Sequence, residues 1–546
     1  MPRDLQADLA TLGTVLDLAE KREFGAAAAL AERTLADGFE HPLLLNVLAT
    51  RLEQEGRLEG ALTLLQRAVA LAPGDVGARN ALSLCLQRLD RPSEALGHAQ
   101  ELVRRNPHLA FAHVNLGNAL IALGELGRAQ SAHSRALELE PGNAVAAAAL
   151  ASIATHRGDH PEARRWAERA LKSVPGFPDA VLSLASAELA DNCIDAAERL
   201  LHRLILDPRA GALDKARASG LLGDVLDAAG RFDAAFDAYQ ACNDALRNFH
   251  RSFADAGTLA YTRALTAAVA ALEPSRWRCD RTPDSAQNAA GHVFLIGFPR
   301  SGTTLLEVIL DGHPQLVSLE EHELLIDGVL EFMREPLDLG PLVDAAPKVL
   351  DRLRAAYWNR VRGAGVDVAG KVFLDKHPLN TLKLPLIARL FPRAKILFAC
   401  RDPRDVVLSC FRRRFKMNPA MYELLSLPGA AAFYAAVMEF AEQMQRVADL
   451  EWRTVRHERL TADVGQEMGA ICEFLGLATS PGMLDFADRV LVRERSTPST
   501  AQLARGLDAR GIGHWRRYEN HVRELEPVLA PWIERFGHPA ATSDPS

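Results

Sequence analysis

Small residues recur with a fixed period in the first half of the chain. Two sets of residues are each spaced 34 positions apart, namely Ala61, Ala95, Ala129 and Ala163, and Pro73, Pro107, Pro141 and Pro175. Small residues at matching places let antiparallel helices approach closely, and a proline ends a helix. The pattern therefore predicts helix pairs over residues 1–272, closed against solvent by a capping helix at 255–272. The expected units are 42–75, 76–109, 110–143, 144–177, 178–210 and 216–249, with a weaker one at 8–41.

A 34-residue period resembles that of the tetratricopeptide repeat. Each unit of such an array contacts only its neighbours, and the stack forms a superhelix with a concave groove. The resemblance implies a scaffold that binds a peptide or protein in this groove. A structural or dimerising arm without a peptide ligand is the alternative that the sequence leaves open.

Beyond residue 291 this period ends, and short apolar runs alternate with amphipathic segments. A turn-rich linker at 273–291 separates the two patterns, and residues 541–546 form a tail. Alternating strands and helices predict an α/β domain over residues 292–540, with a parallel sheet covered by helices on both faces. The runs expected to form strands are Val293–Ile296, Val372–Leu374, Ile396–Ala399 and Thr454–Arg456. Polar or turn residues follow each run, so we expect them to meet at the carboxyl edge of the sheet, where such folds bind ligands.

The first run leads into a glycine-punctuated loop and the start of a helix, at residues 292–304. A loop that ends at a helix N-terminus presents unpaired N–H groups and a positive dipole end, which together favour anions such as phosphate. The spacing Gly297-x4-Gly302 is that of a P-loop, but Thr303 stands where the P-loop lysine is expected. Arg300 places a cation earlier in the loop instead. The sequence thus predicts a P-loop-like anion site in which Arg300 supplies the cation and the usual lysine is absent.

Composition narrows the class of protein. A chain of 546 residues, 48% hydrophobic and 24% charged, is ordinary for a soluble protein of two or three domains. The net charge of −7 argues against nucleic acid as a partner. Because no apolar stretch reaches ~18 residues and no signal peptide begins the chain, we expect no membrane span and a cytoplasmic location. Seven cysteines without CxxC pairs predict reduced thiols rather than disulfides or a zinc site, and the richness in Ala, Arg and Leu suggests a bacterial source.

The loop and the segment after it resemble a known enzyme family. Phe298-Pro299-Arg300-Ser301-Gly302-Thr303-Thr304 and Leu310-Asp311-Gly312-His313-Pro314 are similar to segments of sulfotransferases that use 3′-phosphoadenosine-5′-phosphosulfate (PAPS), most of all protein-tyrosine sulfotransferases and their bacterial relatives. The resemblance spans about residues 292–520. It implies PAPS as co-substrate, the desulfated PAP as product and no metal. The residues implied in holding the phosphosulfate are Arg300, Ser301, Gly302, Thr303 and Thr304.

The resemblance also implies a set of catalytic residues. Glu321 in Ser318-Leu319-Glu320-Glu321 matches the general base for the acceptor hydroxyl, whereas an acidic pair at a helix start is the alternative interpretation. Lys376 in Asp375-Lys376-His377-Pro378 matches a lysine that stabilises charge on the bridging oxygen, and a plain surface lysine is the alternative. Arg300 shares the task of neutralising the leaving phosphate. Ser499 matches a serine that assists the transition state.

A further set resembles the family's 3′-phosphate site. Arg401 and Ser409 match residues that contact the 3′-phosphate, and Arg413 matches an additional arginine. His514 stands where many members carry a basic residue near that phosphate. Arginine suits phosphate because its planar fork makes paired hydrogen bonds.

Neighbouring residues have structural interpretations instead. In the run Arg412-Arg413-Arg414 we expect at least one side chain on a solvated helix face. Arg404 and Asp402 are expected to form an ion pair, and Trp515 to pack the domain. His457 replaces a family tyrosine that contacts the nucleotide, which puts that contact in doubt. Asp375 could in principle hold magnesium, but the adjacent Lys376 disfavours a metal there.

These features together predict a PAPS-dependent sulfotransferase whose acceptor hydroxyl lies on a peptide or protein, tyrosine by preference, presented by the repeats. A carbohydrate, lipid or small metabolite is the alternative acceptor. A scaffold with an inactive nucleotide-binding domain is the alternative from another functional class. An ATP- or GTP-using P-loop enzyme would need a lysine at position 303, where this chain has threonine.

Overall fold

The computed structural model describes residues 5–21, 23–278, 288–484 and 511–539. The chain divides into two compact units, Met1–Cys193 and Ile194–Ser546. The division falls within the region of helix pairs, so the last of these pairs lies in the same unit as the sheet. No helix among the described residues is both long and apolar enough to cross a membrane.

The described residues of the first unit form successive antiparallel helices. The four alanines spaced by 34 residues have no exposed surface. Gly117 brings two helices close together, since a Cβ there would lie 2.4 Å from the His133 ring. The predicted all-helical tetratricopeptide superhelix is confirmed. Its helices are α1 (Leu5–Glu20), α2 (Phe24–Ala36), α3 (Pro42–Gln54), α4 (Leu58–Leu71), α5 (Val76–Arg88), α6 (Pro92–Arg105), α7 (Ala110–Ala122), α8 (Leu126–Leu139), α9 (Ala144–Arg157), α10 (His160–Ser173) and α11 (Pro178–Ala190).

The second unit begins with further helices. They are α12 (Ile194–Leu206), α13 (Ala212–Ala228), α14 (Phe232–Phe249), η1 (Arg251–Ala256), α15 (Thr258–Ala270) and η2 (Pro274–Trp277). Gly223 of α13 faces Tyr239 of α14 as closely as Gly117 faces His133, at 2.4 Å from an added Cβ. The helix expected to close the array against solvent does not do so. Instead, α15 packs on α23 (Leu427–Val447), and its Tyr261 hydroxyl donates to Met333 O at 2.9 Å.

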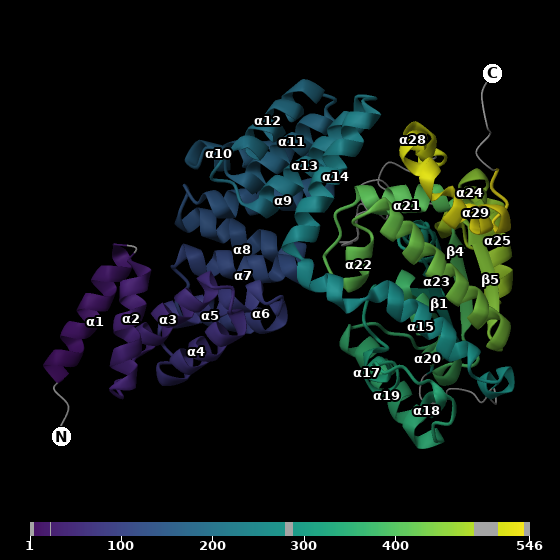
Figure 1. The fold of residues 1–546 in the computed structure, drawn as a ribbon, viewed down its shortest axis with the longest axis horizontal. Helices are drawn as coiled ribbons and strands as arrows, with labels where there is room; N and C mark the ends of the chain where they lie inside the picture. The colour runs from purple at the N-terminus through teal and green to yellow at the C-terminus, as the bar shows by residue number, and fades with distance from the viewer. Residues whose placement is uncertain (1–4, 22, 279–287, 485–510, 540–546) are drawn as a thin grey trace. The chain divides into compact units, whose positions relative to one another are not determined.

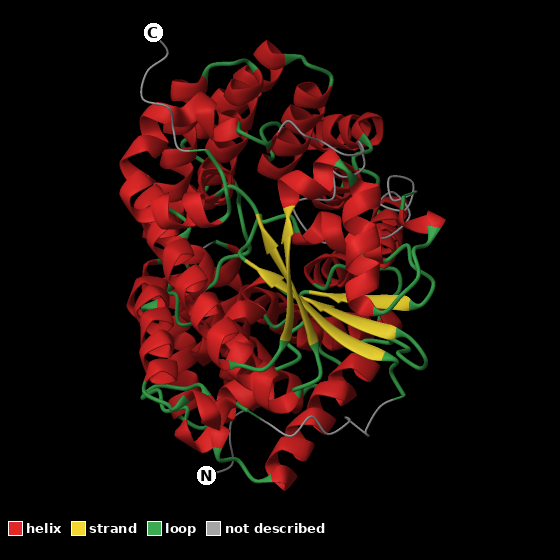
Figure 2. Cartoon of the chain, turned by 90° about the vertical axis from the view of Figure 1, so that its right-hand side faces the viewer, coloured by secondary structure: helices red, strands yellow, loops and turns green. Residues whose placement is uncertain are grey.

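A five-stranded sheet forms the centre of the second unit, and Figures 1 and 2 show its strands among the surrounding helices. All its strands are parallel, in the order β2-β3-β1-β4-β5. Their bounds are β1 (Gly291–Gly297), β2 (Leu316–Glu320), β3 (Val372–Lys376), β4 (Lys395–Cys400) and β5 (Glu451–Arg456). The four predicted strands are confirmed. The edge strand β2 is not among the expected strands, because its polar positions break the apolar run.

Helices cover both faces of this sheet (Figure 2). On one face, Leu295, Leu374 and Leu397 pack in a cluster with α16 (Thr303–Leu310) and α25 (Val464–Leu475). On the other, Phe294 and Phe373 contact aromatic rings of α19 (Pro347–Gly363). The remaining elements are α17 (Ile326–Phe332), α18 (Gly340–Val343), η3 (Pro378–Lys383), α20 (Leu384–Leu390), α21 (Pro403–Arg412), α22 (Pro419–Glu423), α24 (His457–Ala462), η4 (Pro481–Met483), η6 (His514–Tyr518), α28 (Glu519–Val522), η7 (Arg523–Leu525) and α29 (Glu526–Arg535).

Candidate active site

The glycine-punctuated loop lies between the end of β1 and the start of α16. Gly297 has φ +154°, and an added Cβ would lie 2.5 Å from Ala399 O of the neighbouring strand. Gly302 has φ +98°, and an added Cβ would lie 2.7 Å from His457 Nδ1. A side chain at either position would collide with its neighbour and strain the backbone. Both glycines are therefore required by the local geometry, and the loop ends at the first N–H groups of α16.

Thr381 fixes the start of the loop. Its hydroxyl accepts a hydrogen bond from Gly297 N at 3.1 Å and lies 2.7 Å from Gly297 O. The Thr381 side chain has no exposed surface. Nothing in the sequence analysis singled out this residue, since threonine in a turn after a strand carries no specific signal.

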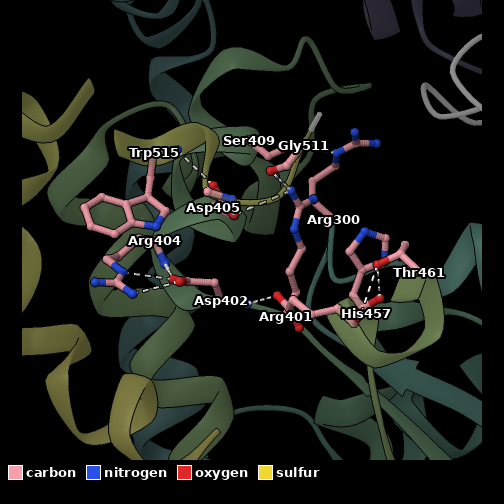
Figure 3. A network of polar contacts seen from close by, with 12 residues as sticks. Arg300, Arg401, Asp402, Arg404, Asp405, Ser409, His457, Thr461, Gly511 and Trp515 are labelled. Carbon is pink, nitrogen blue, oxygen red and sulfur yellow. Dashed lines mark hydrogen bonds and ion pairs between the residues drawn. The ribbon is translucent and has the colours of Figure 1, made fainter. Parts of the chain in front are cut away.

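Arg300 of the loop contacts a serine of helix α21 (Figure 3). Arg300 Nε donates to Ser409 Oγ at 3.0 Å. Burial, and next the charge of Arg413, lower the pKa of Arg300 to about 9. Burial likewise lowers the pKa of Arg413. The Arg413 guanidinium makes no hydrogen bond or ion pair with any residue that the structure describes. The nearby charge of Asp224 raises its pKa but does not outweigh the effect of burial.

Arg401 follows β4 and reaches the segment that begins at Gly511 (Figure 3). Its Nη2 donates to Gly511 O and lies 3.8 Å from Asp405 Oδ2. Asp405 in turn accepts hydrogen bonds from Gly513 N at 2.7 Å and Trp515 N at 2.9 Å. The Arg401 Nε is buried without a partner in the described part of the chain. Arg401 thus has hydrogen-bonding capacity left for an anion.

The structural interpretations for two neighbours are confirmed. Arg404 donates to both Asp402 oxygens, at 3.0 and 2.8 Å, and the pair is buried. The Arg404 guanidinium lies 3.9 Å from the centre of the Trp515 ring, which is itself buried in the domain. Both residues shape the turn after β4 and do not face the loop.

His457 lies beside the loop at Gly302. Burial, and then the charges of Arg401 and Arg300, lower the pKa of His457 to about 3. Its Nδ1 is shielded from solvent and has no hydrogen-bond partner among the described residues. The imidazole is therefore neutral near pH 7, and it occupies space next to the loop where the resemblance placed a tyrosine.

Lys376 lies at the end of β3 among three carboxylates. Its Nζ is 2.8 Å from Glu320 Oε1, 2.9 Å from Glu321 Oε1 and 3.6 Å from Glu307 Oε2. The Lys376 side chain has no exposed surface, so the alternative of a surface lysine is wrong. Burial alone would lower the pKa of Lys376, but the three carboxylates raise it.

Glu320 ends β2 and Glu321 follows it, and helix α17 begins only at Ile326, so the alternative of an acidic pair at a helix start is also wrong. Glu321 has φ +51°, an uncommon backbone conformation for this residue type. Its N–H donates to Lys376 O at 2.7 Å, which holds the turn against β3. The Glu321 side chain is 44% exposed and Glu320 only 16% exposed, so Glu321 is the carboxylate that an incoming molecule can reach.

Asp375 points to the opposite side of β3 from Lys376. It accepts hydrogen bonds from Tyr357 Oη at 2.8 Å and Asn380 Nδ2 at 3.2 Å. Burial raises the pKa of Asp375 to about 6. Among the described residues there is no cluster of His, Cys, Asp and Glu side chains able to hold a metal ion.

The arginine run after α21 differs from the expectation. Arg412 pairs with Asp227 at 2.9 Å and Arg414 with Asp224 at 2.8 Å, and none of the three arginines is exposed. The expected solvated face is therefore wrong, because Arg412 and Arg414 pair with carboxylates of helix α13. His514 also contacts α13, with its Nε2 3.1 Å from Asp227 Oδ1.

The carboxyl ends of adjacent strands bring the predicted residues to one edge. The loop follows β1, Lys376 ends β3, Glu321 follows β2 and Arg401 follows β4. Ser499 lies outside the described residues. Glu307 was missed, although a single charged residue in the otherwise uncharged helix α16 is a signal that could have revealed it.

Comparisons with known proteins match the two halves of the chain to different families. Residues 292–481 match the model of the sulfotransferase family, and residues 12–76, 46–110 and 114–178 match that of the tetratricopeptide repeat. Protein-tyrosine sulfotransferase 2 of Gallus gallus is 25% identical over 268 residues, 46% of this chain and 71% of that protein. Protein-tyrosine sulfotransferase 1 of Danio rerio is 24% identical over 268 residues, 46% of this chain and 74% of that protein.

An uncharacterized protein of Aquifex aeolicus is 24% identical over 261 residues, but the match spans 45% of this chain and only 33% of that protein. A solved tetratricopeptide-repeat protein of Thermus thermophilus is 22% identical over 33% of this chain and 98% of that one, with a TM-score of 0.31. The C-terminal half of the chain thus carries a sulfotransferase-family domain, and the N-terminal half carries tetratricopeptide repeats.

Proposed function

We propose that the protein transfers the sulfuryl group of PAPS to a hydroxyl of a peptide or protein, with tyrosine as the favoured acceptor. The observation that carries the proposal is Arg413, which makes no direct ion pair among the described residues and lies near Arg300, the donor to Ser409. Such a pair of arginines attracts a phosphate, and it lies beside a loop that already favours anions. The matches to protein-tyrosine sulfotransferases support sulfate as the group transferred.

The donor carries an anion at each end of its ribose, and the chain offers a place for each. The N–H groups of residues 300–304 would hold the 5′-phosphosulfate at the start of α16, with Ser301, Gly302, Thr303 and Thr304 lining the turn. Arg401, Ser409 and Arg413 would hold the 3′-phosphate. His514, which bonds to Asp227, would act at the edge of this site, and Ser499 is proposed to assist from outside the described residues.

Glu321 and Lys376 would carry out the chemistry at the other end of the donor. The acceptor oxygen forms a bond to sulfur as the bond from sulfur to the phosphate oxygen breaks, and the hydroxyl proton passes to the Glu321 carboxylate. Lys376 and Arg300 would neutralise the charge that develops on the leaving phosphate. The donor itself supplies the activated sulfuryl group.

The charges of the three carboxylates around Lys376 favour the transfer of the proton together with the departure of the phosphate. One ammonium and three carboxylates sum to a charge of −2 before the proton moves, and to −1 once Glu321 is neutral. The site thus becomes less negative as the leaving phosphate becomes more negative. Glu320 and Glu307 remain beside Lys376 and keep it protonated throughout.

Two alternatives remain for the acceptor and the class of protein. A carbohydrate, lipid or small metabolite could take the sulfate, and the repeats would then bind a partner or a second copy. A scaffold with an inactive nucleotide-binding domain would need neither Glu321 nor Lys376. The proposal extends to a cytoplasmic site of action and a peptide held in the repeat groove.

Two measurements test the proposal. Isothermal titration of the full-length protein should show PAP binding more tightly than ATP, because only PAP carries a 3′-phosphate. Incubation with radiolabelled PAPS and a host lysate should then place label in protein. Tighter binding of ATP would overturn the donor assignment, and label confined to small molecules would overturn the peptide acceptor.

A further inference from the structure

The helix pair α13–α14 holds the chain on both sides of Arg413. Asn243 Nδ2 donates to Phe411 O at 2.9 Å. Asp227 Oδ2 accepts from Arg412 Nη2 at 2.9 Å, and Asp224 Oδ2 accepts from Arg414 Nη2 at 2.8 Å. Residues 411, 412 and 414 are therefore each bound to this pair of helices, whereas Arg413 is not.

The backbone explains why Arg413 is the exception. Helix α21 ends at Arg412, and Arg413 is extended, with φ −98° and ψ 139°. Successive side chains of an extended segment point to opposite sides, so Arg413 and Arg414 leave the backbone in different directions. Arg414 and Arg412 pair directly with carboxylates of α13, whereas Arg413 feels the charge of Asp224 without pairing with it. Gly220 makes room for this packing, since an added Cβ would lie 2.8 Å from Arg414 Cδ. Arg413 consequently lies near Arg300, whose pKa it lowers.

Asp227 also binds a second segment of the site. Its Oδ1 lies 3.1 Å from His514 Nε2 and accepts a hydrogen bond from Tyr518 Oη at 2.5 Å. Burial alone would raise the pKa of Asp227, but the hydrogen bond from His514 and the charge of Arg412 hold it at about 2. The ionised carboxylate therefore joins the arginine run to η6, directly after the Gly511–Gly513 backbone that contacts Arg401 and Asp405.

We propose that α13 is part of the donor site, with Asp227 and Asp224 as positioning residues that direct Arg413 to the 3′-phosphate. This inference rests on the function proposed above. By pairing the two flanking arginines, the carboxylates leave one guanidinium of the three for the donor and fix where it lies. A buried hydrogen bond to a charged group contributes about 1.5–3 kcal/mol, so misplacing it should weaken binding roughly 10- to 100-fold.

If only the attraction between charges mattered, replacing Asp227 would strengthen anion binding and not weaken it. Replacing Asp227 by asparagine removes one negative charge near the site, which would strengthen the binding of every anion if net charge decided affinity. Positioning predicts instead a loss that is confined to ligands with a 3′-phosphate. The two ideas can therefore be separated by comparing ligands that differ only in this group.

The test is isothermal titration of the full-length protein with PAP and with adenosine 5′-monophosphate, which lacks the 3′-phosphate. For Asp227→Asn we expect PAP affinity to fall at least about tenfold, while the affinity for the monophosphate stays close to that of the wild type. Asp233→Asn is the matched control, because Asp233 binds the same C-terminal segment through His521 at 3.0 Å and is 85% exposed. It should leave both affinities unchanged.

Each outcome decides the question. Tighter binding, unchanged binding, or equal losses for both ligands in Asp227→Asn would overturn the inference. If that variant does not fold, Asp224→Asn takes its place, and the same selective loss is expected through Arg414. If the wild-type protein does not prefer PAP to the monophosphate, the proposed function fails. If the wild type prefers PAP and the variants keep that preference, only the positioning role of Asp227 and Asp224 fails.

Discussion

Two carboxylates lie almost equally close to Lys376 Nζ, that of Glu321 at 2.9 Å and that of Glu320 at 2.8 Å. Replacing Glu321 with glutamine would remove the first and leave the second. Because Glu321 is 44% exposed, losing its ion pair should cost at most about 1 kcal/mol of stability. Lys376 keeps Glu320 and Glu307, so no buried charge loses its last partner. The rate should fall about 10²- to 10⁴-fold, the usual contribution of a general base, which corresponds to roughly 3–5 kcal/mol in the barrier.

Glu320→Gln is the matched control for this change. It removes the same charge at nearly the same distance from Lys376, but from a carboxylate that is only 16% exposed. If Glu321 takes the proton, Glu320→Gln should retain most of the transfer rate while lowering stability at least as much as Glu321→Gln. A role limited to holding Lys376 would instead make the two variants equally slow.

The assay is the initial rate of sulfate transfer from radiolabelled PAPS at saturating donor, with the acceptor found by labelling. Thermal unfolding of each variant, measured in parallel, shows whether a slow enzyme is also an unstable one. A Glu321→Gln protein with the wild-type rate, or equal losses in both variants, would refute the assignment of Glu321 as the base.

Three further predictions concern buried charge. Lys376→Met removes the cation that three carboxylates share, one of them on Glu307, whose side chain is 2% exposed, and should destabilise the protein by about 3–5 kcal/mol. An unchanged urea midpoint would contradict this. The pKa of His457 is lowered to about 3 in the folded protein, against about 6.5 in an unfolded chain. Its neutral form therefore contributes fully to folding stability above pH ~6.5, and this contribution is lost as the pH falls towards 3. His457→Gln should therefore lose less stability than the wild type between pH 7 and pH 4, and parallel curves in urea titrations at each pH would exclude the effect. The pKa of Asp375 is raised from 3.8 to about 6. Its charged form therefore lowers the free energy of unfolding above pH 6 by up to about 3 kcal/mol, and this loss disappears as the pH falls towards 3.8. Asp375→Asn should accordingly gain stability relative to the wild type at pH 8 but not at pH 4, and the same difference at both pH values would argue against it.

Local patterns predicted much of the fold. Alanines at a 34-residue spacing mark the seams between helices, because only small side chains fit there, and all four are fully buried. The runs that became β1, β3 and β4 are apolar because these three central strands are buried on both faces. The edge strand β2 could not be found this way, because Ser318 and Glu320, both half-buried, interrupt its apolar residues.

The charged residues of the candidate site were predicted less completely. Motif spacing pointed to Lys376 and Glu321, and the structure places them 2.9 Å apart. Motif spacing could not reveal Glu307, which reaches Lys376 from α16. It also led to a wrong expectation for Arg412 and Arg414, since a run of arginines looks like a solvated face until the helix that covers it is known.

The sequence by itself determined the helix array, the parallel sheet and the glycine-punctuated loop, because periodicity, apolar runs and glycine spacing are properties of neighbouring residues. Only the tertiary structure decided which charges neutralise one another. Asp227 and Arg412 are 185 positions apart, and Asp224 and Arg414 are 190 apart, yet each pair is in direct contact. A guanidinium is available to a ligand only if no carboxylate has been folded against it, and that depends on the packing of distant segments.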